Sequence, residues 1–347
     1  MSKNKFILNA DDFGMSSANN VAVKDGYEYG ILKSTSLTAN GEAFDEAVKQ
    51  IIPACSELGV GVHLNVIEGH ALVDEQRELT DANGKFNNSY GKLILKSYSY
   101  GNNEFMSQLE KEFRAQIERI SEAGVKITHI DSHVHTHAIP PIFDLVCRLA
   151  KEYHINQIRT QHEKFYMVPD ILIHLSPKYL VNLIKIGLLD IFTFQNRRTA
   201  EKYGLNTNDY LIGVGYTSMM NSLTVGCGLS ALQDRKRITA EALIHPCRYE
   251  DGKIDNHFTE YRITQNEKLK TEISMNSPRY DFKPKLYNRN IKSTKNNNRN
   301  IKIEDRLINL GKLRDQKILR KITEQKLYEE KKSNDLSLTK GKNKKTE

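Results

Sequence analysis

Two adjacent aspartates, Asp11 and Asp12, end the first apolar run of the chain, in the segment Asn-Ala-Asp-Asp-Phe-Gly at 9–14. Two carboxylates this close to one another disfavour joint ionisation. A bound cation removes that cost, and one aspartate can then bind the metal while the other acts as a base toward water. Because Asp and Gly also favour turns and helix caps, the same segment is equally typical of a turn without chemistry.

Four histidines and an aspartate alternate with other residues in a second segment, His129, Asp131, His133, His135 and His137. Residues two apart share a face in extended chain, so we expect these side chains along one side at the end of a strand. Imidazoles are common ligands of divalent metals, and the cluster therefore predicts a metal or active site. A single histidine would be more typical of a satisfied core residue. Not all four can be ligands, so the others would orient ligands or bind substrate.

Two further histidines close apolar runs elsewhere in the chain. His63 follows Gly-Val-Gly-Val at 59–62, and His245 follows an apolar run and precedes Pro246. On its own, His63 is more typical of a buried, hydrogen-bonded residue than of a ligand, although its place at a strand end favours a site. His245 is typical of a turn, or of a general acid that reaches the same site.

The elements around these residues alternate between short apolar runs and longer amphipathic ones. The pattern predicts strands at 6–10, 34–39, 60–66, 125–130 and 156–160, and helices at 17–29, 42–58, 104–123 and 142–153. Repeated strand-helix units indicate an α/β fold with parallel strands and crossover helices, either a barrel or an open doubly wound sheet. Ligands bind at the carboxyl ends of such strands. The segment 69–99 has turn signals and little periodicity, and we expect it to pass over the site.

Charge separates the C-terminal part of the chain from the rest. Residues 263–347 hold 23 Lys and Arg against 11 Asp and Glu, a net of +12, whereas the whole chain carries +8. Residues 1–262 therefore carry about −4 and show no nucleic-acid signature. We expect a catalytic domain at 1–262 and a basic extension at 263–347 that is partly helical, at 303–328, or disordered. Such an extension is more typical of a solvated tail than of one that binds anionic surfaces.

The spacing of the cysteines and the length of the apolar runs indicate the cellular compartment of the protein. Cys55, Cys147, Cys227 and Cys247 form no CxxC pair and are widely spread, which indicates a reduced, cytoplasmic protein. The first apolar run is too short for a signal peptide, and no uncharged stretch is long enough to span a bilayer. The sequence predicts a soluble protein with no membrane partner.

Four ordered segments together carry a resemblance to a known family. They are Asn-Ala-Asp-Asp-Phe-Gly at 9–14, Gly-Val-His-Leu-Asn at 61–65, Leu-Thr-Asp-Ala-Asn-Gly-Lys-Phe at 79–86 and His-Ile-Asp-Ser-His-Val-His-Thr-His at 129–137. In order and spacing they resemble the YdjC-like carbohydrate deacetylases, which include the chitooligosaccharide deacetylases. The similarity runs from about residue 4 to about residue 262.

The resemblance implies a (β/α) barrel-like, distorted fold and a divalent metal usually assigned as Mg²⁺. By motif position, Asp12, His63 and His133 match the metal ligands of the family, and Asp11 matches its base. Two imidazoles and a carboxylate are also a common zinc set, which leaves Zn²⁺ or another transition metal open. His245 falls where the family has His-Pro-Gly, but here the third residue is Cys247.

The implied reaction is the deacetylation of an N-acetylated sugar or oligosaccharide by a metal-activated water. We expect His245, or one of His135 and His137, to protonate the leaving amine. The remaining polar positions, Asn65 and Arg159 among them, would contact the sugar or support the ligands.

Two other functions compete with this interpretation. One is a different metal-dependent amidohydrolase or a phosphoesterase, although such barrels typically place His-x-His on the first strand. The other is a carbohydrate-binding protein without catalysis, although every reactive position holds a competent residue. The sequence requires no nucleic acid, leaves a homodimer open and indicates no partner for the tail.

Overall fold

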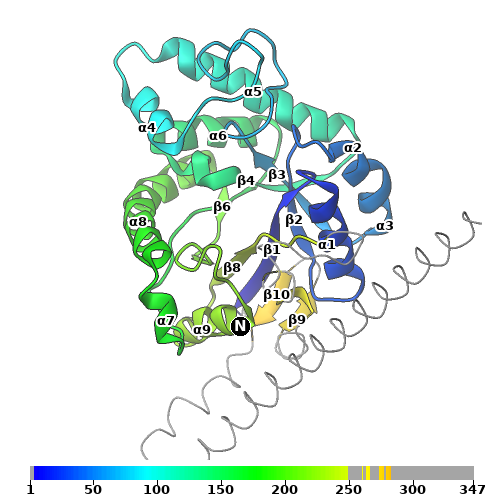
Figure 1. Cartoon of the computed structure of the whole chain (residues 1–347), viewed down its shortest axis with the longest axis vertical. Helices are drawn as coiled ribbons and strands as arrows, with labels where there is room; N and C mark the ends of the chain where they lie inside the picture. The colour runs from blue at the N-terminus through cyan, green and yellow to red at the C-terminus, as the bar shows by residue number, and fades with distance from the viewer. Residues whose placement is uncertain (1–3, 249–259, 261–262, 266–272, 277–278, 283–347) are drawn as a thin grey trace, which may run out of the picture. The chain divides into compact units, whose positions relative to one another are not determined.

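Eight parallel strands form one curved sheet in the computed structural model, which describes residues 4–248, 260, 263–265, 273–276 and 279–282 (Figure 1). Their spatial order is β7-β8-β1-β2-β3-β4-β5-β6. The strands are β1 (Lys5–Phe13), β2 (Ser34–Leu37), β3 (Gly59–Leu64), β4 (Ile127–Ser132), β5 (Gln157–Ile158), β6 (Asn206–Thr207), β7 (Tyr210–Ile212) and β8 (Thr239–Ile244).

The sheet curls toward a barrel without a regular ladder between its two edge strands, β6 and β7. Instead, the loop after β5 bridges this side. The backbone N–H of Leu211 donates to the carbonyl of His162, and the Asn208 amide exchanges hydrogen bonds with the backbone of Thr160. The α/β prediction with a distorted barrel-like fold is therefore confirmed, and the open doubly wound alternative is wrong.

Two short antiparallel strands, β9 (Ile273–Asn276) and β10 (Arg279–Phe282), join the same sheet. β10 pairs with the beginning of β1, where Lys5 lies opposite Asp281. The chain divides into a unit at Met1–Tyr287 and a unit at Asn288–Glu347, and the second lies wholly outside the described residues. The expected boundary after residue 262 stays a prediction, and the expected helix at 303–328 also lies outside the described residues.

Helices flank the strands. They are α1 (Ser17–Glu28), α2 (Phe44–Glu46), the π-helical turn Ala47–Ile51, α3 (Ile52–Ala54), α4 (Tyr90–Tyr98), α5 (Asn103–Glu122), α6 (Pro140–Glu152), α7 (Ile171–His174), α8 (Pro177–Tyr203) and α9 (Ser222–Ala231). In Figure 1, α1 to α3 lie on one side of the strands and α7 to α9 on the other. Among the described residues, no helix is long and apolar enough to cross a membrane.

Local sequence explains where the regular helices begin and what they bury. The Ser16 hydroxyl accepts a hydrogen bond from the backbone N–H of Asn19 and caps α1. α6 begins at Pro140, whose fixed φ suits a first helical position. The predicted stripe of α5 is buried as expected, at Phe105, Leu109, Phe113, Ile117 and Ile120.

Three segments differ from the prediction. The expected helix at 42–58 ends at Ala54, and a π-helical turn divides it. The segment 69–99 contains the helix α4 in addition to its turns. The 27-residue helix α8 was not predicted. Its own apolar residues are distributed around the whole helix, so the sequence shows no one-sided apolar period.

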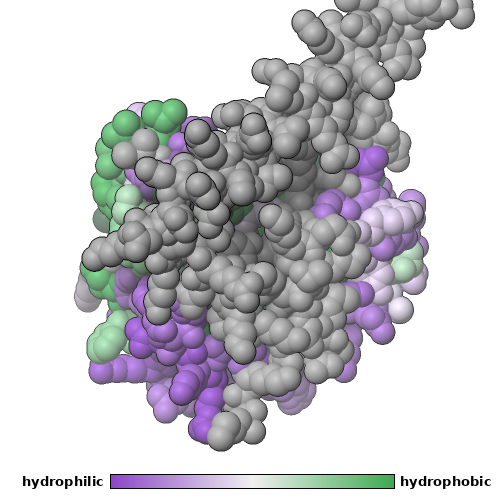
Figure 2. Space-filling model, turned by 90° about the horizontal axis from the view of Figure 1, so that it is seen from below, coloured by the Kyte–Doolittle hydropathy of each residue, from purple (hydrophilic) through white to green (hydrophobic). Residues whose placement is uncertain are grey.

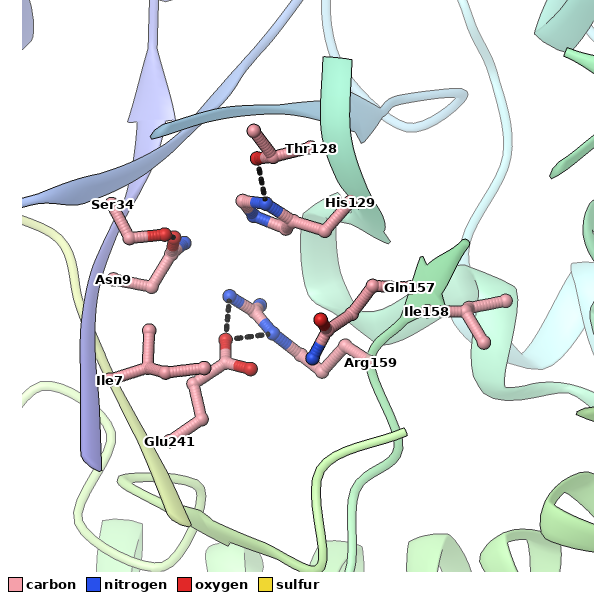
Figure 3. A pocket seen from close by; sticks show the side chains of 9 residues that line it. All are labelled: Ile7, Asn9, Ser34, Thr128, His129, Gln157, Ile158, Arg159 and Glu241. Atoms are coloured by element: carbon pink, nitrogen blue, oxygen red, sulfur yellow. Dashed lines mark hydrogen bonds and ion pairs between the residues drawn. The ribbon is translucent and has the colours of Figure 1, made fainter. Parts of the chain in front are cut away.

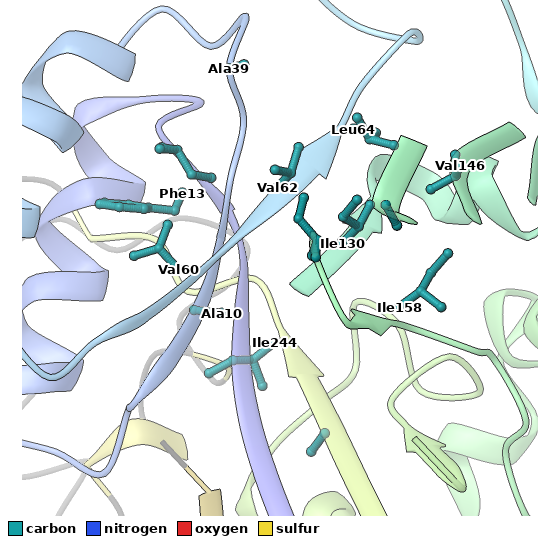
Figure 4. Close-up of a cluster of buried hydrophobic side chains, with 14 of the residues drawn as sticks. Ala10, Phe13, Ala39, Val60, Val62, Leu64, Ile130, Val146, Ile158 and Ile244 are labelled. Carbon is teal, nitrogen blue, oxygen red and sulfur yellow. The ribbon is translucent and has the colours of Figure 1, made fainter. Parts of the chain in front are cut away.

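The core fills the space between the strands and the helices around them. Figure 4 shows Val62 and Leu64 of β3 beside Ile130 of β4 and Val146 of α6. These are β-branched or aliphatic side chains with little or no exposure, and they fix the relative positions of the central strands. The polar side chains at the carboxyl ends of the same strands are therefore held on a rigid base.

Candidate functional site

A break in β1 brings both aspartates to one side of the sheet. The register of β1 against β2 shifts between Ala10 and Phe13, and Asp12 has a left-handed φ of +63°. In a regular strand, consecutive residues would point to opposite faces. The irregularity lets Asp11 and Asp12 line the same pocket, and Asp is one of the few residues that tolerates this conformation.

Asp12, His63 and His133 meet at one point above the strands. Oδ1 of Asp12 lies 2.9 Å from Nδ1 of His133 and 3.3 Å from Nε2 of His63. One donor atom from each residue lies within 4.8 Å of the others. These residues come from the ends of β1, β3 and β4, so three parallel strands position them.

The histidine cluster does not continue as extended chain. β4 ends at Ser132, and His133–Ala138 forms a 3₁₀ turn in which Val134 and His135 have φ values of +54° and +59°. The expectation that five alternating side chains share one face is therefore wrong. The turn separates them: His133 and His135 line the pocket, whereas His137 is enclosed.

The charges around Asp12, His63 and His133 favour a positive charge between these three side chains. Burial would raise the pKa of Asp12, yet hydrogen bonds from His133 and His63 hold it well below its usual range. Burial also lowers the pKa of an imidazole, but the charge of Asp131 and the hydrogen bonds to Asp12 and Asp131 raise that of His63 to about 10. The group of side chains is thus suited to hold a cation.

Asp131 fixes the orientation of His63 from behind. Its Oδ1 lies 2.7 Å from Nδ1 of His63, and its Oδ2 accepts a hydrogen bond from the Ser36 hydroxyl at 2.6 Å. Oδ2 also lies 2.6 Å from Nη2 of Arg159. A carboxylate that holds Nδ1 leaves Nε2 of His63 directed toward Asp12, as in the carboxylate-histidine pairs of metal sites.

Arg159 holds Asp11 by a two-pronged ion pair inside the barrel. Its Nη1 lies 2.7 Å from Oδ2 of Asp11, and its Nη2 lies 2.8 Å from Oδ1. The side-chain amide of Asn9 also donates to Oδ1 of Asp11 at 2.8 Å. The carboxylate of Asp11 is therefore held in one orientation, with 2% of the residue exposed.

Behind this pair lies a second, polar cavity of about 200 Å³ in the interior of the barrel (Figure 3). Glu241 of β8 accepts hydrogen bonds from Arg159 in this cavity, with Nε 2.7 Å from its Oε1. Burial raises the pKa of Glu241 to about 7, although Arg159 opposes the shift. His129 faces the same cavity and bonds with Thr128, so it lies apart from His133 and His135.

His245 follows β8 and is paired with Glu260. The backbone N–H of His245 donates to Oε2 of Glu260 at 2.5 Å, and its Nδ1 lies 3.2 Å from the same oxygen. Burial lowers the pKa of His245, but the bond and charge of Glu260 outweigh burial and raise it to about 9. The imidazole is therefore protonated at neutral pH and faces the pocket.

The pocket that unites these groups has a volume of about 420 Å³, within the usual range for small-ligand sites. It is lined by Asp11, Asp12, Met15, Ser16, Asn19, His63, Glu68, Ser132, His133, Val134, His135, Lys185, Thr217, His245 and Cys247. Acidic side chains alternate with imidazoles in its lining, since Asp12 lies against His63 and His133, and Glu68 lies beside His133. The pocket is thus built for a polar ligand.

Three of the predicted site residues are not among the described residues that line this pocket. Asn65 caps the turn after β3, where its Oδ1 accepts from the backbone N–H of Ile67 and Glu68. His137 bonds with Ser132 and with the carbonyl of Arg159, and burial lowers its pKa to about 4. Arg159 is held by carboxylates, as described above. These three support the site from behind.

Four charged residues at or near the site were not predicted from the sequence. Glu68 lies 3.5 Å from Nε2 of His133, and Lys185 reaches the pocket from α8. Glu260 and Glu241 hold His245 and Arg159 respectively. Each is an isolated charged residue with no motif around it, so a single sequence carried no signal for them.

The donor set fits a divalent cation. Two imidazole nitrogens and one carboxylate oxygen converge, and Asp131 supports one imidazole from the outer side. Two histidines and one carboxylate are common ligands of Zn²⁺ and of other transition metals, with a further position left for water or substrate. The residues present therefore match what a catalytic metal needs.

Comparison with known proteins identifies relatives of the chain. A model of the YdjC-like protein family matches residues 5–276. Carbohydrate deacetylases of Brevibacillus brevis and Clostridium beijerinckii are 38% and 37% identical to the chain over 151 residues. The matched segment covers 44% of this chain and 57% and 58% of those relatives. The chain thus spans less than two thirds of the length of the curated relatives it matches.

A solved structure supports the fold. The crystal structure of a candidate cellobiose-phosphate cleavage protein from Enterococcus faecalis matches with a TM-score of 0.55 and 18% identity. The match covers 78% of this chain and 94% of that one. At this identity, the likeness concerns the architecture alone.

Proposed function

The chain belongs to the YdjC-like protein family, and from this premise we propose that it is a metal-dependent deacetylase of N-acetylated sugars. The observation that carries the proposal is the meeting of Asp12, His63 and His133 beside Asp11 in one pocket. The names of the curated relatives support the reaction class.

Asp12, His63 and His133 would hold one divalent cation. When bound, such an ion supplies Lewis-acid activation of a water and of the acetamide carbonyl. The side chains prepare this site in advance, because Asp131 fixes His63 and Glu68 lies beside His133. The family resemblance implies Mg²⁺, whereas the donor set equally suits Zn²⁺; elemental analysis of protein purified without chelator identifies the ion.

Asp11 is the proposed base. It accepts the proton of the attacking water, and the oxygen of that water forms a bond to the acetamide carbon. Arg159 and Asn9 hold the carboxylate of Asp11 in place, so no side-chain rotation precedes the proton transfer. Arg159 would therefore act through Asp11, by holding its carboxylate.

His245 is the proposed general acid. Its raised pKa keeps a proton on the imidazole at neutral pH, and Glu260 orients the ring toward the pocket. The proton passes to the sugar nitrogen as the carbon–nitrogen bond breaks, which releases acetate and a free amine. Burial holds the pKa of His135 well below its usual range, so this imidazole is neutral and a poorer proton donor.

Acetate release from a panel of N-acetylated mono- and oligosaccharides tests the proposed reaction and identifies its substrates. We expect acetate and a free sugar amine in equal amounts from at least one member of the panel. Phosphate released from sugar phosphates without acetate would instead identify a phosphoesterase. Sugar binding without any product, measured by calorimetry on metal-loaded protein, would identify a binding protein.

A further inference from the structure

The interior of the barrel is more polar than parts of its outer surface. Hydrophobic residues gather along the left edge of the molecule in Figure 2, whereas the strands enclose polar side chains such as Asn9, Ser36, His129 and Asp131. Buried polar groups are costly unless each finds a hydrogen-bond partner. His129 belongs to this interior and lies apart from the pocket, so the proposed reaction leaves it without a role.

A glycine in β3 gives His129 of β4 access to Ser36 of β2. β3 lies between these two strands, and Gly61 is the register partner of Ser36. The imidazole of His129 packs directly on Gly61, because a Cβ added there would lie 2.4–2.6 Å from the ring. Nε2 of His129 thereby comes within 3.1 Å of the Ser36 hydroxyl oxygen across the intervening strand. A side chain at position 61 would occupy the space of this contact.

The Ser36 hydroxyl joins His129 to Asp131. Its oxygen lies 2.6 Å from Oδ2 of Asp131 and 2.8 Å from the side-chain nitrogen of Asn9. A hydroxyl has one proton to donate and can accept two hydrogen bonds. The carboxylate of Asp131 takes that proton, because it is the charged acceptor at the shorter distance. The Ser36 oxygen therefore accepts from Asn9 and from Nε2 of His129.

The tautomer of His129 follows from these hydrogen bonds. Burial lowers the pKa of His129 to about 4, so its imidazole is neutral at neutral pH and carries one N–H. That proton lies on Nε2, which donates to Ser36. Nδ1 then accepts from the Thr128 hydroxyl at 2.8 Å. With both nitrogens engaged, the ring keeps the Ser36 hydroxyl directed toward Asp131.

Asp131 links this hydrogen-bond chain to His63. Its other oxygen, Oδ1, lies 2.7 Å from Nδ1 of His63, its register partner between β3 and β4. We propose that His129 is a positioning residue, which holds His63 in place through Ser36 and Asp131. The proposal rests on the proposed function, because it takes His63 as a metal ligand. Arg159 also holds Oδ2 of Asp131 at 2.6 Å, so losing His129 should cost less than losing Asp131 itself.

Zn²⁺ titrations of His129→Leu and His129→Gln against a competing chelator test the proposal. The two new side chains are similar in size, but only the glutamine amide can donate to Ser36. We expect His129→Leu to weaken Zn²⁺ binding roughly 3–10-fold, less than the loss of a direct outer-shell partner, and His129→Gln to stay within about two-fold of wild type. His162→Leu is the control, since His162 pairs with Asp190 away from the pocket. Equal losses in the Leu and Gln variants would overturn the proposal.

Ser36→Ala tests the route by which His129 acts. If the effect passes through the Ser36 hydroxyl, adding His129→Leu to Ser36→Ala should cost no further Zn²⁺ affinity. Losses that add in full in the double variant would show that His129 acts by another route, and would contradict the proposal.

The Nδ1 proton of His63 gives a measurement that does not depend on metal. An N–H donated to a carboxylate gives a proton NMR signal at low field, and its loss in His63→Gln identifies it. In His129→Leu this signal should move upfield and exchange faster with water, whereas in His129→Gln it should stay in place. An unchanged signal in His129→Leu would overturn the proposal and leave the metal centre intact. A wild-type chain that binds no Zn²⁺ would instead overturn the metal centre itself.

Discussion

Asp11 and Asp12 are neighbours in the chain but have different partners. Asp12 faces two imidazoles, whereas Asp11 is held by a guanidinium and an amide. This difference supports separate roles for the two carboxylates, one as ligand and one as base. The pair itself was readable from the sequence, but the partner of each aspartate depends on strands that meet only in the folded chain.

Replacing Asp11 with Asn should reduce turnover by a factor of about 10²–10⁴, because an amide cannot accept the proton of water. The affinity for metal should stay within a few-fold of wild type, since the donor atoms of Asp12, His63 and His133 are unchanged. Acetate release and calorimetric metal titration measure the two effects separately. A variant with near wild-type turnover would remove Asp11 as the base.

Replacing Asp131 with Asn should weaken metal binding about 10–100-fold, because the amide no longer fixes His63 through a charged hydrogen bond. Asp190→Asn is a matched control, since Asp190 also pairs with a histidine, His162, at 2.9 Å but away from the pocket. Metal titrations of both variants give the comparison. Equal affinities in the two variants would contradict the supporting role of Asp131.

At the scale of elements, regular periods were predictable and irregular turns were not. The stripe of α5 followed its sequence spacing and is buried as expected. The turn after β4 was missed because Val134, which is β-branched, rarely adopts the left-handed conformation that Val134 and His135 both have here. Such a turn is stabilised by the surrounding contacts, and no local sequence signal announces it.

The close contact between β3 and β4 depends on a glycine. A Cβ on Gly61 would lie 2.4–2.6 Å from the His129 ring, which faces the barrel interior. Gly61→Ala should therefore lower the free energy of unfolding by about 1–3 kcal/mol through overpacking. Gly91→Ala on α4 meets nothing and should be neutral or slightly stabilising. Chemical denaturation of both variants measures this, and equal stabilities would show that the ring moves freely.

At the scale of the whole molecule, the strand-helix alternation predicted the class of fold, and the structure selected the barrel. The sequence could not predict that β6 and β7 are very short, because two- and three-residue strands have no period. It also could not predict the polar interior, in which Arg159 meets Asp11, Asp131 and Glu241. Arg159 lies 148 positions from Asp11 and 82 from Glu241 along the chain, so only the curled sheet brings these charges together.

The buried Glu241 should make the stability of the fold depend on pH. Its folded pKa of about 7 lies above the usual value near 4.5, so the unfolded chain releases this proton at a lower pH than the folded chain. Stability should therefore fall as pH rises from about 4.5 to 7, by roughly 2–4 kcal/mol from this group. Glu241→Gln removes this contribution. Unfolding curves from pH 4.5 to 8 should show a shallower decline for the variant, and parallel declines would contradict the assignment.

A chelation experiment shows whether the removal of acetyl groups depends on a metal held by Asp12, His63 and His133. Acetate release from N-acetylated oligosaccharides is measured for the full chain as purified, after removal of metal by chelator, and after its return. We predict that release stops on chelation and recovers when one equivalent of divalent metal is restored. Acetate release that continues in folded, metal-free protein would contradict the roles of Asp12, His63 and His133.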